Sequence, residues 1–266
     1  LAEHKNHKVN FLFVAHRKEI LEQSIKKFRA VLKDNNFGNL MVDGITPPSF
    51  DNLFVSIQTF NSKELCERIS SDFYDYIVVD EFHHAAAKSY QKLLSHFKPK
   101  ILLGLTATPE RMDGKDILKY FNGKISAEIR LPEAIDKNLL VPFSYFGISD
   151  DTDLSMVKWS RGGYDEKELD NILSENKERA AIIIKSLDTY LNDIDSVKGL
   201  GFCVSKKHAN YMAEVFSGNG IPSISLNSDS SDGERNNVQN KLVKGEIKFI
   251  FVVDLYNEGI DIPEVN

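Results

Sequence analysis

The sequence predicts an α/β protein of two domains, each a parallel β-sheet flanked by helices. Short apolar runs alternate with longer segments in which apolar residues recur every three or four positions. The short runs are apolar on both faces, which is typical of parallel strands covered by helices on each side. With 266 residues and 42% hydrophobic content, the chain suits one large or two compact domains.

The first half of the chain predicts one sheet. A strand at 11–15 precedes a helix over 17–32, in which the apolar residues fall on one face. The same alternation predicts further strands and helices, and these are strands at 53–57, 76–79 and 101–105, a helix centred on Leu65 and a helix over 85–97. We expect the first domain to span 1–141.

The second half repeats this alternation after a polar, irregular stretch. We expect 142–176, which contains the only tryptophan, Trp159, to connect the domains. The second domain is then expected over 177–266. Its predicted elements are a helix near 178–191 and strands at 200–204, 223–226 and 249–253.

Composition excludes several classes of protein. The net charge of −6 gives no global attraction to nucleic acid, so such binding must come from a local surface. Cys66 and Cys203 form no CxxC pair, which argues against a zinc site or a disulfide framework. No run approaches 18 apolar residues and no apolar signal segment begins the chain, so we expect a cytoplasmic protein without a membrane partner.

The carboxylates Asp80 and Glu81 directly follow the predicted strand 76–79. Ligands of open parallel sheets bind beyond the carboxyl ends of the strands. A carboxylate there can hold Mg²⁺, usually through water, which suits Asp80. Glu81 could orient or deprotonate a water that attacks a phosphate. The alternative is that the pair only caps the following helix, since acidic residues favour helix N-termini.

The neighbouring histidines His83 and His84 are poor candidates for a metal site, because adjacent side chains rarely converge on one ion. We expect His83 to hydrogen-bond a polar group on the next strand. Thr106 and Thr108 follow the strand 101–105 and can both donate and accept. The alternative is that both threonines only cap the strand end.

The ordered set of strand-end segments resembles the motifs of a DExH-type superfamily 2 helicase or translocase. The matching segments are AHRKEIL at 15–21 (motif Ia), SIQTF at 56–60 (Ib), DEFHH at 80–84 (II), LTATPER at 105–111 (III), FCVSKKHA at 202–209 (IV) and DLYNEGIDIP at 254–263 (V). The combination of a DExH box, TATP and NEGIDIP is specific. Within the superfamily, these motif sequences are most similar to those of bacterial DNA-dependent members related to the motor subunits of restriction enzymes.

The resemblance implies two RecA-like domains, ATP and Mg²⁺ as cofactors, and nucleic acid, above all DNA, as partner. It also suggests nuclease or restriction domains or subunits as further partners. Asp80 would hold magnesium and Glu81 would activate water. His83 with Thr106 and Thr108 would couple the nucleotide site to the nucleic-acid track.

The resemblance also implies which residues contact nucleic acid and nucleotide. In the first domain, Arg17, Gln58 and Thr59 match positions that grip the backbone of one strand. The helix 17–32 carries other basic residues, but most such lysines only solvate a helix face. The remaining matches lie in the second domain. Ser205 and Lys206 match positions that contact the nucleic-acid strand, and Gly259 and Asp261 match positions at the nucleotide cleft.

Two motifs of that family do not occur in this sequence. Motif I, a glycine-rich loop with a phosphate-binding lysine, would precede the strand 11–15, and motif VI, with an arginine finger, would follow motif V. We therefore expect two truncated RecA-like domains from the centre of a longer motor, with negligible ATP hydrolysis by this chain alone. The alternative is a non-catalytic nucleic-acid-binding or scaffolding module. The many polar strand ends favour the motor.

Overall fold

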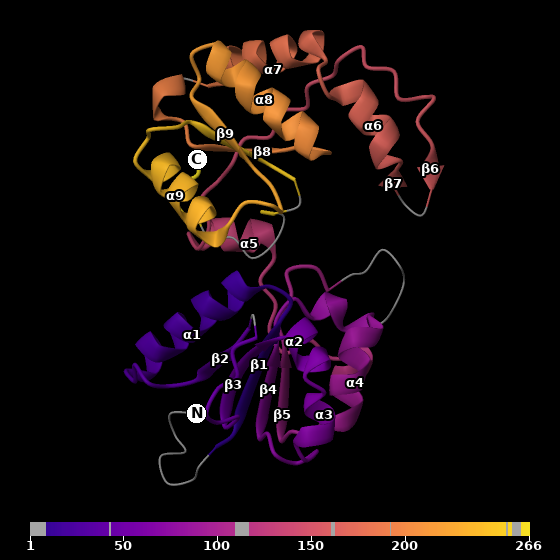
Figure 1. The fold of residues 1–266 in the computed structure, drawn as a ribbon, viewed down its shortest axis with the longest axis vertical. Coiled ribbons are helices and arrows are strands. Elements are labelled where there is room, and N and C mark those ends of the chain that lie inside the picture. The colour runs from indigo at the N-terminus through magenta and orange to yellow at the C-terminus, as the bar shows by residue number, and fades with distance from the viewer. Residues whose placement is uncertain are drawn as a thin grey trace. The chain divides into compact units, whose positions relative to one another are not determined.

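The structure is a computed structural model that describes residues 9–42, 44–109, 117–160, 163–191, 193–253, 255–256 and 262–266. The chain divides into two compact units, Leu1–Pro142 and Phe143–Asn266 (Figure 1). Each unit contains its own parallel sheet, which confirms the fold class that the sequence predicts. No helix in the described part of the chain is long and apolar enough to cross a membrane.

The sheet of the first unit has the strand order β2-β3-β1-β4-β5, and all its pairings are parallel. Its strands are β1 (Phe11–Ala15), β2 (Asn39–Met41), β3 (Asn52–Ser56), β4 (Tyr76–Val79) and β5 (Ile101–Gly104). The sequence predicts all of these except the short edge strand β2. The strand expected at 53–57 ends at Ser56, because the Ser56 side chain caps a helix that begins at Ile57.

Helices cover both faces of this sheet (Figure 1). The helical segments of the first unit, not all of which lie on the sheet, are α1 (Lys18–Leu32), α2 (Ile57–Ser62), α3 (Leu65–Arg68), η1 (Phe82–Ala86), α4 (Lys88–His96), η2 (Leu118–Phe121) and α5 (Leu131–Asp136). The helix expected over 85–97 is thus divided in two. Its first part is the 3₁₀ segment η1, and Ala87 adopts an extended conformation before α4 begins.

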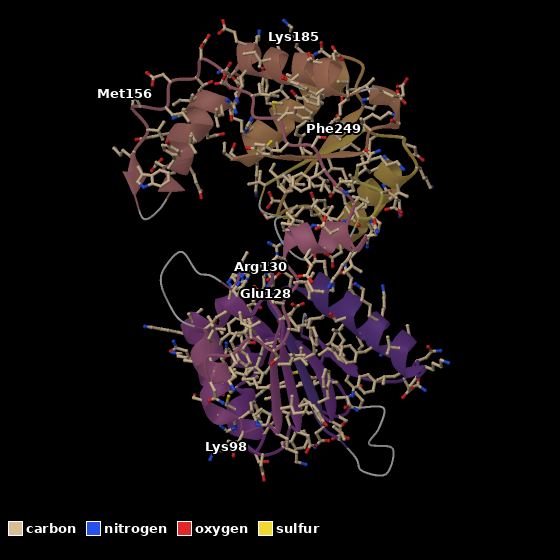
Figure 2. All side chains as sticks on the ribbon, turned by 180° about the vertical axis from the view of Figure 1, so that it is seen from behind. Lys98, Glu128, Arg130, Met156, Lys185 and Phe249 are labelled. Atoms are coloured by element: carbon tan, nitrogen blue, oxygen red, sulfur yellow. The ribbon has the colours of Figure 1, made fainter. Side chains whose placement is uncertain are left out.

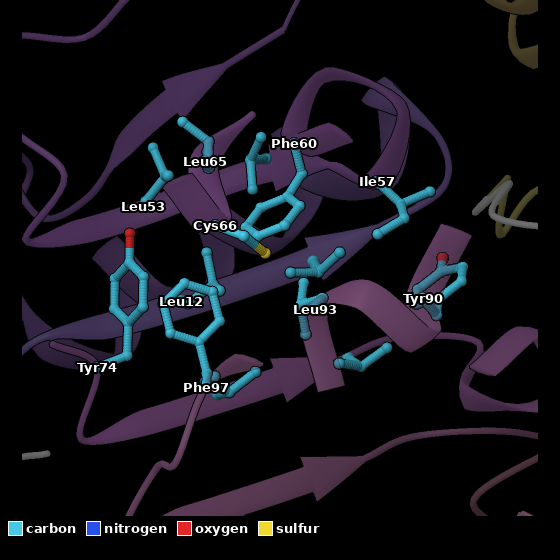
Figure 3. Close-up of a cluster of buried hydrophobic side chains, with 14 of the residues drawn as sticks. Leu12, Leu53, Ile57, Phe60, Leu65, Cys66, Tyr74, Tyr90, Leu93 and Phe97 are labelled. Atoms are coloured by element: carbon cyan, nitrogen blue, oxygen red, sulfur yellow. The ribbon is translucent and has the colours of Figure 1, made fainter. Parts of the chain in front are cut away.

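The alternation of side chains along β1 explains why the first unit has two apolar clusters. Leu12 and Val14 face one side and pack with residues of α2, α3 and α4. Figure 3 shows Leu12 in this cluster with Phe60 and Leu93. Phe11 and Phe13 face the other side, where α1 contributes Leu21 to the second cluster. Each fully buried side chain of this kind stabilises the fold by roughly 1.5–3 kcal/mol relative to exposure. β1 is therefore the central strand of the domain.

The edge strand β5 differs from the expectation of a strand covered on both faces. Ile101 and Leu103 remain 51% and 44% exposed, and Leu105 just after the strand is 41% exposed. On its other face, Gly104 leaves room for the rings of Phe82 and Phe121, because a Cβ atom at Gly104 would come within 2.7 Å of both. Within the described residues, one face of β5 is therefore open.

The second unit is built on the parallel sheet β8-β10-β9. Its strands are β8 (Gly199–Phe202), β9 (Ser223–Leu226) and β10 (Phe249–Val252), and its longer helices are α7 (Lys177–Tyr190), α8 (Lys206–Gly218) and α9 (Asp232–Val243). Phe249 and Phe251 pack against α8 in an apolar cluster. Figure 2 labels Phe249 among the side chains of this unit. Gly199 and Gly201 of β8 admit these rings, since a Cβ atom at either glycine would overlap them.

The stretch expected to be irregular contains regular elements in the second unit. These are the hairpin strands β6 (Trp159–Ser160) and β7 (Gly163–Tyr164) and the helix α6 (Glu166–Leu173), and a short 3₁₀ segment, η3 (Ile194–Ser196), follows α7. The Asp165 side chain caps α6 by accepting hydrogen bonds from the amides of Lys167 and Glu168. The domain limits at 141 and 177 that the sequence suggests stay predictions.

Candidate functional site

The carboxyl ends of the central strands of the first unit lie side by side. The register pairs Ala15 of β1 with Ser56 of β3, and Val79 of β4 with Gly104 of β5. The polar segments that follow these strands therefore begin at one edge of the sheet. This edge carries the first-unit residues that sequence reasoning selects as a site, from Arg17 to Thr108.

Asp80 and Glu81 form a tight turn at the end of β4. The Asp80 amide donates to the Val14 carbonyl at 2.9 Å, which extends the pairing with β1 beyond the strand. The Asp80 Oδ1 atom accepts the Glu81 amide at 2.9 Å. Glu81 has a left-handed backbone, with φ 49° and ψ 52°. Such a conformation costs a non-glycine residue about 1–3 kcal/mol and is often found at functional sites.

The Glu81 side chain does not cap the helical segment that follows it, because η1 has no side-chain cap hydrogen bond. Its Oε2 atom instead lies 3.2 Å from Nδ1 of His83. Both side chains are mostly shielded from solvent, with 20% and 16% exposure. The geometry thus disfavours the capping alternative for Glu81.

His83 joins the carboxylate to the neighbouring strand. Its Nδ1 atom is 3.0 Å from Thr106 Oγ1 as well as 3.2 Å from Glu81 Oε2. An ionised carboxylate can only accept, so the Nδ1 atom carries the proton and shares it between the two oxygens. Thr106 Oγ1 also accepts the Thr108 amide at 3.1 Å, while the Thr108 residue itself is exposed. Thr108 therefore contributes its backbone to the cluster.

The donor set at Asp80 fits a magnesium ion that arrives with a nucleotide. Mg²⁺ is usually bound by one or two carboxylates, with waters and substrate phosphates as its other ligands. Asp80 is half-buried at the strand end and supplies one such carboxylate. No group of three or more His, Cys, Asp or Glu suited to a metal ion occurs in the part of the chain that the structure describes. A permanent metal centre such as zinc would need that larger set.

Arg17 lies at the same edge and contacts His16, whose ring lies beside the ring of His84. Sequence reasoning selected neither histidine as a site residue. The Arg17 Nε atom donates to Nε2 of His16 at 3.2 Å. The His16 ring lies 5.2 Å from the His84 ring, which in turn lies 4.1 Å from the His83 ring. His16 lies two positions after Val14, so the pairing of β1 with β4 places it beside the start of η1. The strand order would have revealed this contact.

Gln58 and Thr59 stand in the first turn of α2 and differ in their freedom to bind a ligand. The Ser56 hydroxyl accepts a hydrogen bond from the Thr59 amide at 3.1 Å and donates one to the Thr59 hydroxyl at 2.9 Å. Gln58 is exposed. The Gln58 amide group is therefore the more accessible of the two side chains.

In the second unit, Ser205 and Lys206 already have partners within that unit. The Ser205 hydroxyl caps α8 by accepting the His208 amide at 2.9 Å, and it donates to Asp170 of α6. The Lys206 Nζ atom is 2.6 Å from Asp229 Oδ2. These hydrogen bonds fix the turn between β8 and α8. Gly259 and Asp261 lie outside the described residues.

The electrostatics near α8 are set by burial and charge. His208 is 7% exposed, and burial together with the nearby Arg179 charge lowers the pKa of His208. Its Nδ1 atom accepts the Val204 amide at 3.4 Å, which suits a neutral ring. Hydrogen bonds from Ser174 and Ser205 lower the pKa of Asp170. An ionised Asp170 therefore anchors α6 to the start of α8.

Two parts of the chain match two family models. Residues 1–111 match "Type III restriction enzyme, res subunit", and residues 168–266 match "Helicase conserved C-terminal domain". The chain is therefore similar to superfamily 2 helicases and to restriction-enzyme subunits, as the sequence motifs indicate.

Individual relatives agree with this class. The putative ATP-dependent helicase IRC3 of Saccharomyces cerevisiae is 28% identical over 96% of this chain and 37% of its own length. A 51.5 kDa protein of a Lactococcus phage is 25% identical over 95% of this chain and 50% of its own. The type I restriction enzyme EcoAI endonuclease subunit of Escherichia coli is 26% identical over 77% and 27%, respectively. The chain thus spans half or less of the length of these curated relatives.

Solved structures show the same fold. S. cerevisiae Dbp5 bound to RNA and ADP BeF3 aligns with a TM-score of 0.58 and 14% identity, over 98% of this chain and 62% of that one. The Pyrococcus furiosus Hef helicase domain aligns with a TM-score of 0.51 and 14% identity, over 98% and 80%. The RecA-like character of both sheets follows from this similarity.

Proposed function

We propose that the chain forms the central part of an ATP-dependent helicase or translocase that couples ATP hydrolysis to movement along a nucleic-acid strand. The observation that carries the proposal is the contact of Glu81 with His83 and of His83 with Thr106, beside Asp80 at the carboxyl edge of the sheet. It joins a candidate base to the neighbouring strand through one shared proton. The proposed domains span 1–141 and 177–266, connected by 142–176.

In this proposal, bound ATP would supply the reactive phosphate, and the Mg²⁺ bound with it would offset the negative charge of that phosphate. Asp80 holds the ion, through water, and Glu81 orients the attacking water and takes its proton. His83 contacts the Glu81 carboxylate and connects it to Thr106 and, through the Thr106 hydroxyl, to the Thr108 amide. Gly259 and Asp261 are proposed nucleotide contacts on the second domain.

The proposed track for nucleic acid consists of Arg17, Gln58 and Thr59 on the first domain and Ser205 and Lys206 on the second. Such contacts with phosphates position a strand without reading its sequence, as movement along any sequence requires. Lys206 would exchange its ion pair with Asp229 for a phosphate. The 48% exposure of the Lys206 side chain permits that exchange.

We propose DNA as the natural strand. The similarity to a restriction-enzyme subunit supports DNA, and it also suggests nuclease or restriction domains or subunits as partners. The solved Dbp5 structure contains RNA, but its 14% identity supports only the fold. RNA is therefore the competitor in the experiment that follows.

The experiment measures ATP hydrolysis by the full-length protein alone, with single-stranded or duplex DNA, and with RNA of the same sequences. We expect turnover that rises with DNA, and negligible turnover by residues 1–266 alone, where the glycine-rich loop and arginine finger do not occur. If RNA stimulates ATP hydrolysis to the same extent as DNA, the assignment of DNA as the natural strand is wrong. Absence of turnover with every nucleic acid, despite binding, would favour a scaffolding module instead.

A further inference from the structure

Three histidine rings form a continuous row at the carboxyl edge of the first sheet. His16 follows β1, whereas His83 and His84 belong to η1 after β4. The rings of His16 and His84 are 5.2 Å apart at 63°, and those of His84 and His83 are 4.1 Å apart at 45°. The pairing of β1 with β4 fixes this proximity, because the Asp80 amide still binds the Val14 carbonyl.

One end of the row contacts a candidate strand-binding residue, and the other end contacts the candidate general base. At one end, the Nε2 atom of His16 accepts a hydrogen bond from Arg17, the candidate strand-binding arginine, at 3.2 Å. At the other end, the Nδ1 atom of His83 lies 3.2 Å from Oε2 of Glu81, the candidate base. The row therefore leads from the proposed nucleic-acid track to the proposed catalytic carboxylate.

The chemistry of the contacts makes the row sensitive to Arg17. The guanidinium group is a permanent donor, so while it binds Nε2 the His16 ring is held in one orientation with its proton on Nδ1. A phosphate competes for the same guanidinium through charge-assisted hydrogen bonds. When Arg17 turns to a phosphate, the His16 ring loses this hydrogen bond, and its edge contact with His84 changes.

We propose that His16 and His84 are positioning residues that couple strand binding at Arg17 to the release of Glu81. Without a strand, the row holds His83 against Glu81, and the shared proton engages the Oε2 atom, which lowers the basicity of the carboxylate. Strand binding reorients His16 and His84, and His83 then frees Glu81. His84 is the central ring of this coupling, which rests on the proposed function.

The test uses the full-length protein and compares His84→Ala with His84→Phe. The alanine variant removes the central ring, whereas phenylalanine retains an aromatic ring of similar shape. The matched control is His96→Ala on α4. His96 also has an aromatic neighbour, Phe97 at 4.7 Å, and a hydrogen bond to Ile69 O at 2.9 Å.

The readouts are hydrolysis without and with DNA, and the dissociation constant for DNA. We expect His84→Ala to raise the basal rate and reduce the stimulation ratio by about tenfold, within the range of typical couplings, while DNA affinity stays within about twofold. His84→Phe should restore most of the ratio, and His96→Ala should retain it.

An unchanged ratio in His84→Ala would overturn the coupling and leave the proposed function intact. Equal losses in His84→Ala and His96→Ala would also overturn it, since they would indicate general destabilisation. A wild-type protein that no nucleic acid stimulates would instead overturn the proposed function and this inference with it. A circular-dichroism melting curve establishes that each variant is folded.

Discussion

The His83 Nδ1 atom lies 3.0 Å from the Thr106 Oγ1 atom, so a side-chain hydrogen bond joins the segments after β4 and β5, beside the backbone hydrogen bond from the Phe82 amide to the Leu105 carbonyl at 2.7 Å. His83 and Thr106 are separated by 23 positions in sequence. Since β4 and β5 are paired in register from Tyr76 to Val79, the contact depends on the sheet itself. Movement of one strand end is therefore transmitted to the other.

Replacing Thr106 by Val should weaken this connection at almost constant volume. Valine retains the branched shape but cannot accept from His83 or from the Thr108 amide. In the full-length protein, we expect the nucleic-acid-stimulated rate to fall by about tenfold, in line with the 5–150-fold range of typical couplings, with ATP affinity little changed. Thr106→Ser retains a hydroxyl and is the control. If valine and serine behave alike, the hydroxyl has no role in coupling.

Arg17→Ala should weaken DNA binding through the loss of a phosphate contact. For one such contact, the slope of log affinity against log salt concentration should decrease by about one. The control is Lys26→Ala, which removes a positive charge from the exposed face of α1. Titration of labelled DNA at several salt concentrations measures both slopes. An equal effect of the two substitutions would show that only net charge matters at this surface.

The stability of the second unit should decrease as pH falls below the ordinary histidine pKa of about 6.5. Burial lowers the pKa of His208, so in this range the unfolded chain binds a proton that the folded unit does not. The free energy of unfolding therefore decreases as the pH decreases. Above that range the contribution is constant.

His208→Asn offers an acceptor for the Val204 amide without a titrating ring, so it should reduce this dependence. Chemical denaturation followed by circular dichroism at several pH values tests the difference. The same pH dependence in wild type and variant would exclude His208 as its source.

Cys203 should react slowly with alkylating reagents in the folded protein. Burial raises the pKa of the Cys203 thiol to about 12, so little of the reactive thiolate is present near neutral pH. Mass spectrometry of peptides labelled with and without urea measures the difference. Labelling of native Cys203 at the rate of a free cysteine would contradict the packing of this thiol in the second unit.

The sequence predicts the strands well because their apolar runs are long enough to be recognised. The edge strand β2, Asn39–Met41, has three residues and one fully buried side chain, so its pattern is too short to detect. Ile57 continues the apolar run of β3 but begins α2, because the Ser56 cap acts through a hydrogen bond that composition does not reveal.

The site is predictable only where one strand follows another in order. The contact of His83 with Thr106 could be predicted, because the two residues follow β4 and β5, which are consecutive in sequence and pair with each other. The contact of His16 with His84 could not, since it depends on β1 lying beside β4. The partners of Ser205 and Lys206 were also missed, because they come from positions 35 and 23 residues away.

The most direct test of the account is the effect of Glu81→Gln on hydrolysis in the full-length protein. Glutamine retains the size and one carbonyl oxygen but cannot take a proton from water. We expect DNA-stimulated turnover to fall by about 10²–10⁴-fold, the usual contribution of a general base, while ATP and DNA still bind. Turnover near the wild-type rate, or loss of ATP binding, would contradict the account, because Glu81 would then be a structural residue.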